Sequence, residues 1–394
     1  MLLCDITLKF PSAELVLFST LTLHLHTTDT AIIFFVPCSA RLVCFGCFLV
    51  SYRCESISSC VFITPSPGLV SFQRPALVCS EAFSAFLYKH CPVVAERFSP
   101  TPWCWGGRLQ TLVFAVLKSR PPVSYRNELI RTVDGGQISL DWLDNQASVT
   151  YPESSTRPTV LILPGITGNS QQSYVLHAIS QATRHGYSMV LLNYLACKRT
   201  ESGLVAGITI SVPWDALKFS SSMEEPLNWL LFNRHITKSL HQILNRHRKI
   251  LEKVVDVDYV LKARSIREFD ERFTSLMFGY SSCMDYYRDA SPVSGLQKVS
   301  SSRVCFVSTL LSVYIHLDFF FPAFTAFPVS VVQDLPNVAL VLTAHGGHIA
   351  FLQGFFPLGE SYMERLFGQF VHAVFEHREE MKQACGIREE QMKD

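Results

Sequence analysis

The sequence predicts an α/β fold, and three stretches of the 394-residue chain indicate it. "RPTVLILPG", beginning at Arg157, contains the aliphatic run of a strand buried on both faces. "SYVLHAISQATRHGY", beginning at Ser173, spaces its apolar residues as an amphipathic helix does and reaches the helix stop Gly186. "NVALVLTAHGGHIAFLQG", beginning at Asn337, again starts as a buried strand and continues into a loop. Strands that alternate with helices favour a sheet covered by crossover helices.

Composition narrows the class of protein. Thirty-four Lys and Arg balance 33 Asp and Glu, so no strong field draws the chain to nucleic acid, and we expect no nucleic-acid partner. Hydrophobic residues make up 48% of the chain, enough for a large core. Only 17% of residues are charged and the mean hydropathy is +0.21, which suggests a membrane contact or an unusual segment.

The first 70 residues form an apolar N-terminal segment. Within it, residues 31–52, "AIIFFVPCSARLVCFGCFLVSY", are long enough to cross a bilayer core of about 30 Å. Pro37 and Arg41 interrupt this run, and an arginine at mid-membrane costs about 2.5–3.5 kcal/mol on insertion scales. We expect a single-pass membrane protein anchored here, the alternative being a buried or irregular segment. Cys44 and Cys47 form a lone CxxC without a second pair, so we expect no metal and no cofactor.

The remaining chain divides into an N-terminal helical region at 71–120, an α/β domain at 121–378 and a C-terminal tail at 379–394. In the α/β domain, "ELIRTV" and "QISLDW" can pair as a hairpin across 134–136, Asp-Gly-Gly. The residue pattern at 213–292 is typical of helices and predicts a helical cap over the sheet edge. Ser265 and Glu268 stand at capping-box spacing and predict a helix start. An amphipathic helix follows from Tyr362.

Two loops follow buried strands, at the edge where open α/β sheets place their sites. In "LPGITGNS", Gly165 and Gly168 let backbone N–H groups turn outward before a helix, as an oxyanion hole requires, although an ordinary strand-to-helix turn looks the same. In "HGGHIAFLQG", His345 and His348 flank two glycines, and a histidine just past a strand end suits a general base. Either histidine could also be an ordinary loop residue.

The chain resembles the AB hydrolase 4 family over about residues 74–295 and 326–376. The matching stretches include "PTPWCW", "RPTVLILPGITGNSQQSYVLHA", "SIREFDERFTSLMFGYSSCMDYYRDASP" and "NVALVLTAHGGHIAFLQG". The resemblance is strongest to the membrane-anchored phospholipase and esterase branch. It implies an α/β-hydrolase fold and a Ser/Asp/His triad that cleaves acyl esters of phospholipids or glycerolipids. It also implies His348 as the catalytic base and Gly165, Ile166 and Thr167 as the oxyanion loop.

The nucleophile departs from the family pattern. Members carry a GxSxGG turn after a strand, where glycines allow the strained backbone that exposes the serine. No GxSxG occurs in this chain, and the nearest remnant is Ser188 in "GYSMV", where Val190 replaces the second glycine. The interval after the oxyanion loop is too short for the family's strands and helices, so the fold is expected to lack one strand-helix unit. Ser188 is a candidate nucleophile, and a structural strand serine is the alternative.

The acid of the triad is also displaced. The family places an aspartate in a DDxFxP-like turn, whereas "HLDFFFP" offers only Asp318, with Phe320 and Pro322 at the matching offsets. Asp318 is therefore the candidate that orients His348, or else a strand-end carboxylate.

Two functions of different classes follow from the sequence. The first is a serine hydrolase of lipid acyl esters. The second is a catalytically inactive, hydrolase-like protein that binds lipid or membrane. In both, the expected partners are lipids and a membrane, and no protein partner can be inferred.

Overall fold

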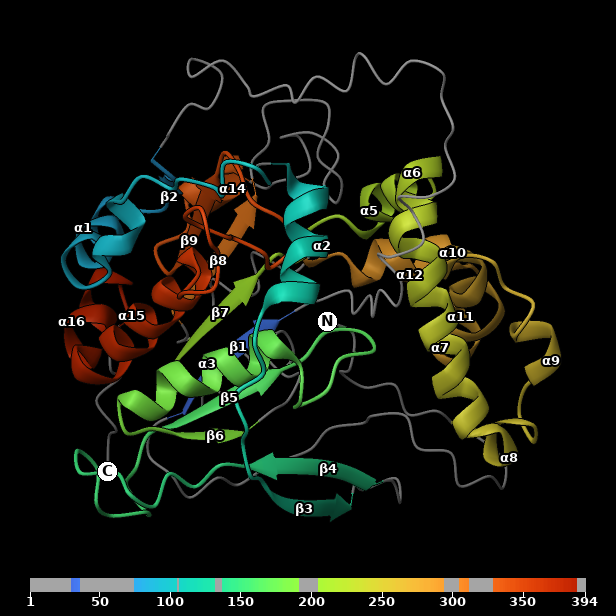
Figure 1. Ribbon diagram of the computed structural model, residues 1–394, viewed down its shortest axis with the longest axis horizontal. Coiled ribbons are helices and arrows are strands. Elements are labelled where there is room, and N and C mark those ends of the chain that lie inside the picture. The colour runs from blue at the N-terminus through green and yellow to red at the C-terminus, as the bar shows by residue number, and fades with distance from the viewer. Residues whose placement is uncertain are drawn as a thin grey trace.

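The computed structural model describes residues 30–35, 74–104, 106–131, 137–190, 205–293, 305–311 and 329–387 (Figure 1). In these residues the larger sheet has the strand order β2-β9-β8-β7-β1-β5-β6. The strands are β1 (Thr30–Phe35), β2 (Ala76–Val78), β5 (Thr159–Leu163), β6 (Ser188–Val190), β7 (Ala206–Ile210), β8 (Cys305–Leu311) and β9 (Val338–Thr343). All neighbours run parallel except β2, which pairs antiparallel with β9. The predicted α/β class is confirmed.

Strand β1 lies in the middle of this sheet, between β5 and β7 (Figure 1). Ile33 pairs with Ile162 of β5 on one side and with Ile208 of β7 on the other. Residues 31–35 of the predicted membrane anchor therefore belong to a strand, and its residues 36–52 lie outside the described part of the chain. In the described part, no helix combines the length and apolar character needed to cross a membrane.

The main core forms between the sheet and helices α3 (Ser173–Arg184) and α15 (Tyr362–Glu376), which pack against each other. Helices α1 (Glu81–His90) and α2 (Gly107–Leu117) belong to the same core, because both bury aromatic side chains in it. Members of this core include Phe83, Phe86, Phe114, Val160, Ile162, Val175, Ile179, Ile208, Phe367 and Phe370. The helical region predicted at 71–120 thus shares one core with the α/β domain.

The predicted hairpin is confirmed as β3 (Arg126–Arg131) and β4 (Gln137–Trp142), which pair antiparallel in a separate two-stranded sheet. Its predicted turn at 134–136 lies outside the described residues. A single bridge between Leu143 and Met189 links the end of this hairpin to β6.

The predicted helical segment 213–292 has a hydrophobic core of its own, which includes Phe232, Ile236 and Phe269. Its elements are α5 (Ala216–Met223), α6 (Pro226–Asn228), α7 (Arg234–Arg246), α8 (Arg248–Leu251), α9 (Val257–Val260), α10 (Ile266–Phe269), α11 (Ser275–Met277) and α12 (Cys283–Ala290), with π-helical turns at Trp229–Asn233 and Asp270–Thr274. These helices lie beside the sheet in Figure 1.

Helix α10 begins at Ser265, as the sequence predicts, because the Ser265 side chain accepts a hydrogen bond from the N–H of Glu268. The second half of the predicted capping box differs. The Glu268 carboxylate accepts from the N–H of Arg264, one residue earlier than the box requires.

The predicted C-terminal helix is in fact two helices. It breaks at His377, whose φ of −124° and ψ of 36° lie outside the helical region, and α16 (Arg378–Ala384) continues in another direction. Met381 and Cys385 of this second part are buried and belong to the main core. The first part of the segment 379–394, predicted as a tail, therefore packs on the domain.

Candidate active site

The loop that follows β9 carries His348 and is tightly built. Gly346 has a φ of +135°, a conformation that favours glycine, and packs against the ring of Phe351. Gly347 leaves no room for a side chain, since a Cβ there would lie 2.7 Å from both the Gly107 carbonyl oxygen and the Thr111 nitrogen. The two glycines therefore allow the loop to turn against α2.

Two hydroxyl groups from other elements hold the backbone around His348. The His348 N–H donates to Thr111 Oγ1 of α2 at 2.9 Å. The next N–H, of Ile349, donates to Ser211 Oγ at 3.0 Å, and Ser211 directly follows β7. His348 itself is 8% exposed. The backbone at His348 is thus held by α2 and by the residue that follows β7, which lies two strand positions from β9.

The loop after β5 contains the predicted oxyanion residues. Thr167 has a φ of +64°, and the Gly168 N–H closes a turn by donating to the Gly165 carbonyl at 2.8 Å. A Cβ at Gly168 would lie 2.8 Å from the Tyr174 hydroxyl, so the loop packs on the start of α3. Ile166 is 47% exposed, which leaves this side of the loop open to a ligand. The loop is thus a tight turn with one side exposed to solvent.

A half-buried phenol supports the far end of the oxyanion loop. The Tyr125 hydroxyl donates to the Ser170 carbonyl at 2.7 Å. Burial raises the pKa of Tyr125 to about 12, and the nearby charge of Asp141 adds to the effect. The phenol therefore keeps its proton and remains a donor at neutral pH.

One small cavity is lined by a neighbour of each loop, although neither His348 nor residues 165–168 line it themselves. Tyr174, which contacts Gly168, and Ile349, the neighbour of His348, both line it. Its remaining apolar walls come from α2, α3, β7 and α15, namely Phe114, Ala178, Ile210, Met363 and Phe367. Each candidate loop thus follows the carboxyl end of a strand, β5 or β9, and has one neighbour at this cavity.

Ser188 lies elsewhere. It is the first residue of the edge strand β6 and pairs with Thr159, the first residue of β5, so it stands at the amino end of the parallel strands. His348 follows the carboxyl end of β9, which is five strand positions away, or about 24 Å at the usual strand spacing. The structure does not bring these two residues together.

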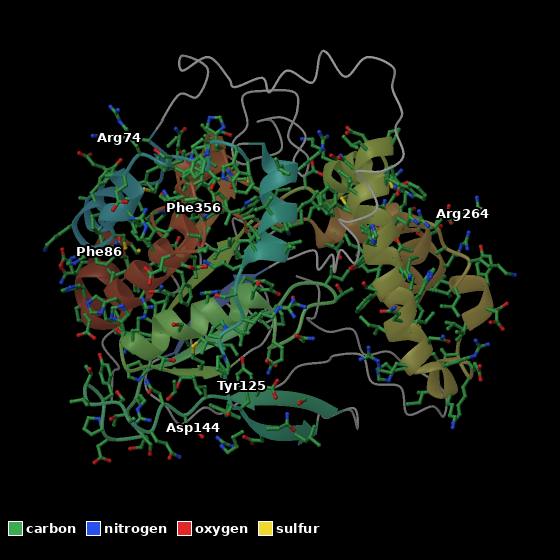
Figure 2. All side chains as sticks on the ribbon, in the orientation of Figure 1. Arg74, Phe86, Tyr125, Asp144, Arg264 and Phe356 are labelled. Atoms are coloured by element: carbon green, nitrogen blue, oxygen red, sulfur yellow. The ribbon has the colours of Figure 1, made fainter. Side chains whose placement is uncertain are left out.

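The hydroxyl of Ser188 has a structural partner. It is buried and donates to the carbonyl oxygen of Asp144 at 3.2 Å. Asp144 follows β4, and Figure 2 shows it far from Phe356, which comes shortly after His348 in the chain. This contact joins the edge strand to the hairpin. Asp318, the predicted acid, lies outside the described residues.

Thr111 and Ser211 are the site residues that sequence reasoning missed. They contact residues 237 and 138 positions away in the chain, respectively. Ser211 has a φ of +54° and is fully buried, which is uncommon for a residue other than glycine. Serine and threonine are common in loops and helices, so no local pattern distinguished these two.

Comparison with known proteins identifies relatives along most of the chain. Phospholipase ABHD3 of Homo sapiens is 44% identical over 363 aligned positions, which take up 78% of this chain and 87% of the relative. Protein abhd-3.2 of Caenorhabditis elegans is 28% identical and covers 73% of this chain and 88% of its own length. Monoacylglycerol lipase ABHD2 of Bos taurus is 21% identical, over 82% of this chain and 89% of its own. No family model matches the chain, and no solved structure matches it.

Proposed function

This chain belongs to the AB hydrolase 4 family, and from that premise we propose that it hydrolyses acyl esters of lipids. The human and bovine relatives are named as a phospholipase and a monoacylglycerol lipase, and both names denote lipid ester hydrolases. The observation that carries the proposal is the pair of loops at the carboxyl ends of β5 and β9, whose neighbours Tyr174 and Ile349 line one small cavity.

The geometry suggests a role for each loop. His348 is the general base that takes the proton from the attacking hydroxyl and later gives it to the leaving alcohol. Backbone N–H groups of residues 165–167 stabilise the negative charge on the carbonyl oxygen in the tetrahedral intermediate. Water then attacks the acyl enzyme, and the fatty acid leaves. Thr111 and Ser211 are positioning residues, since they act through the backbone beside His348.

The nucleophile in this proposal is a hydroxyl other than that of Ser188, because the described geometry keeps Ser188 at the opposite edge and the opposite end of the sheet. Asp318 remains the proposed acid on the strength of its sequence offsets alone. The roles of His348 and residues 165–167 do not depend on which hydroxyl attacks.

We also propose that the chain lacks the strand-helix unit that presents the nucleophile in the family. Two observations support this. The human relative matches over 363 positions that take up only 78% of a 394-residue chain, so it has residues in the matched region without a counterpart here. In addition, β1 occupies the place between β5 and β7, although it comes from the N-terminal segment. In this proposal β1 fills the position of the missing strand.

A second candidate function, lipid binding without hydrolysis, is favoured by the absence of any GxSxG sequence. Exposed apolar residues after the histidine loop support contact with lipid in either case. Phe355, Phe356 and Leu358 are 63%, 78% and 68% exposed. Trp103, itself 45% exposed, donates from Nε1 to the Phe355 carbonyl at 2.7 Å and fixes this surface. Attachment to a membrane stays part of the proposal, but not through a helix over residues 31–52, because residues 31–35 form β1.

Labelling by a fluorophosphonate probe distinguishes the two candidates. The full chain is purified in detergent, labelled, digested and mapped by mass spectrometry, beside a His348→Gln variant. A labelled serine in the wild type and loss of label in the variant support hydrolysis. A folded chain that binds phospholipid vesicles, stays unlabelled and releases no fatty acid from them would replace hydrolysis by the lipid-binding function.

A further inference from the structure

A cluster of two histidines and a glutamate lies outside the candidate active site, where the first described helix meets the last one. His90 is the last residue of α1, His377 stands between α15 and α16, and Glu380 is on the first turn of α16. Their possible ligand atoms all lie within 4.8 Å of one another. From this geometry we propose that the cluster binds a divalent transition-metal ion, with zinc as the best-suited example.

The residue types match the chemistry of zinc. Zinc takes imidazole nitrogens and carboxylate oxygens, and sites with three protein ligands complete a tetrahedron with water. Imidazole selects zinc, copper or nickel over calcium and magnesium, which prefer oxygen ligands. Two imidazoles and one carboxylate therefore indicate a transition metal.

Two of the three ligand atoms are close to the spacing that an ion needs. His90 Nε2 lies 2.9 Å from Glu380 Oε2. Bonds of about 2.0–2.1 Å to nitrogen and oxygen at a tetrahedral angle separate two ligand atoms by about 3.3 Å, so this pair moves apart by a few tenths of an ångström. The ring of His377 stacks on that of His90 with centroids 3.8 Å apart, and it must turn to point a nitrogen at the ion. The ion would take the place of the proton between His90 and Glu380, and that proton would pass to solvent.

The surroundings hold the ligands in place while leaving access from solvent. The side chain of His90 is 9% exposed and its ring packs against Phe86, a core residue labelled in Figure 2. Glu380 is 41% exposed at its side chain, and His377 is also exposed. Lys89 Nζ binds the other carboxylate oxygen, Glu380 Oε1, at 2.8 Å. Lys89 therefore orients the carboxylate so that Oε2 faces the imidazoles.

The position gives the ion a structural role. The backbone break at His377 turns α16 toward α1, and Met381 anchors α16 in the core. A bound ion would clamp α1 to the C-terminal helix, and ions that bind only the folded chain stabilise it. This site is independent of the proposed hydrolysis.

The chain offers a matched control. His185 and His372 also stack, with centroids 4.6 Å apart and the same interplanar angle of 29°. The nearby Glu376 instead bonds to the hydroxyls of Tyr151 and Tyr187. A His372→Gln variant therefore removes a stacked histidine from the same helix end without touching the proposed ligands.

The test measures zinc binding to the full chain after its cysteine thiols are blocked with N-ethylmaleimide and bound metal is removed by a chelator. We expect one zinc ion per chain by native mass spectrometry, and a rise in melting temperature on adding zinc. His90→Gln and His377→Gln should each weaken binding by at least about tenfold, since even residues around a metal ligand contribute 10-fold to 100-fold. His372→Gln should bind zinc as the wild type does.

Cobalt(II) provides a second readout, because its visible spectrum reports tetrahedral nitrogen and oxygen ligands. If the histidine variants fail to fold, Glu380→Gln on the exposed turn of α16 carries the same expectation. The proposal is overturned if the wild type binds no zinc. It is equally overturned if a folded His90→Gln or Glu380→Gln chain binds zinc as tightly as the wild type.

Discussion

Two regions of the large sheet hold their polar residues in different ways. At the β9 edge, meaning the carboxyl end of β9 beside the edge strand β2, hydroxyl groups of Thr111 and Ser211 accept hydrogen bonds from the N–H groups of His348 and Ile349. At the β6 edge, the Ser188 hydroxyl is itself used in a contact, to the Asp144 carbonyl. The contacts at His348 thus involve its backbone, whereas the contact at Ser188 uses its side chain. The difference supports the proposed role of His348 and a structural role for Ser188.

Replacing His348 by glutamine tests the β9 edge and should have the largest effect. Loss of a general base lowers kcat/KM by about 10²-fold to 10⁴-fold. The backbone contacts to Thr111 and Ser211 remain, so the melting temperature should change little. Hydrolysis of a short-chain ester and circular dichroism measure the two quantities. His345→Gln is the control, and an equal loss of activity in both variants would contradict the assignment.

The buried carboxyl of Asp270, in the helical segment 213–292, should have the next largest effect, and only on the free energy of unfolding. Burial raises the pKa of Asp270 to about 6, although hydrogen bonds from Thr274 and Tyr287 oppose the shift. Because the folded pKa lies above the unfolded one, this carboxyl favours the folded state below about pH 4, and that contribution is lost as the pH rises through about 6. The difference between the folded and unfolded pKa values corresponds to about 3 kcal/mol in the free energy of unfolding.

Asp270→Asn should remove this pH dependence. Urea unfolding at several pH values between about 4 and 7 measures it. Asp258→Asn on the exposed surface of the same cap is the control and should keep the wild-type slope. An unchanged slope in Asp270→Asn would show that the buried carboxyl is not its source.

Adding one methyl group at Gly347 should disturb the β9 edge. The new Cβ would meet backbone atoms of Gly107 and Thr111 at 2.7 Å, so the loop must move away from α2. Such overpacking costs about 1–3 kcal/mol, and the displaced His348 should lose activity as well. Gly359→Ala, which has open space around its Cβ, should leave the free energy of unfolding and the rate unchanged. Wild-type stability and activity in Gly347→Ala would refute the close packing.

Thr111→Val should have the smallest of these effects. It removes the acceptor of the His348 N–H, and a lost hydrogen bond costs about 1 kcal/mol. Since Thr111 acts through His348, kcat should fall more than KM rises. Thr111→Ser keeps the hydroxyl and should restore kcat. Failure of serine to restore it would mean that Thr111 contributes through packing alone.

Local sequence patterns were sufficient to predict the helices and strands of the domain named here. The aliphatic run at Thr159–Leu163, the helix that ends before Gly186 and the hairpin at 126–142 all form as the sequence predicts. Each of these depends on periodicity or on turn chemistry, which neighbouring residues determine.

Two features of the fold depend on distant partners and were therefore not predictable. An apolar run such as residues 31–35 suits a buried strand and the start of a membrane helix equally. Only its pairing with β5 and β7 shows that it is a strand. The break at His377 has no glycine or proline to mark it, and it occurs where His377 stacks on His90.

The candidate site was predicted in part. The loops at 165–167 and 345–348 were recognised because glycines follow buried strands there. The cavity lined by their neighbours Tyr174 and Ile349 was not predicted, because it depends on how α2, α3 and α15 pack. Ser188 became a candidate through the glycine two residues before it, but such a local pattern does not determine at which end of a strand a residue lies.

The most direct test compares fluorophosphonate labelling and ester hydrolysis in the wild type, Ser188→Ala and His348→Gln. We expect Ser188→Ala to match the wild type in both readouts, since the Ser188 hydroxyl joins β6 to the hairpin. We expect His348→Gln to lose both. Loss of label in a folded Ser188→Ala chain would make Ser188 the nucleophile and would contradict the separation of the two edges described above.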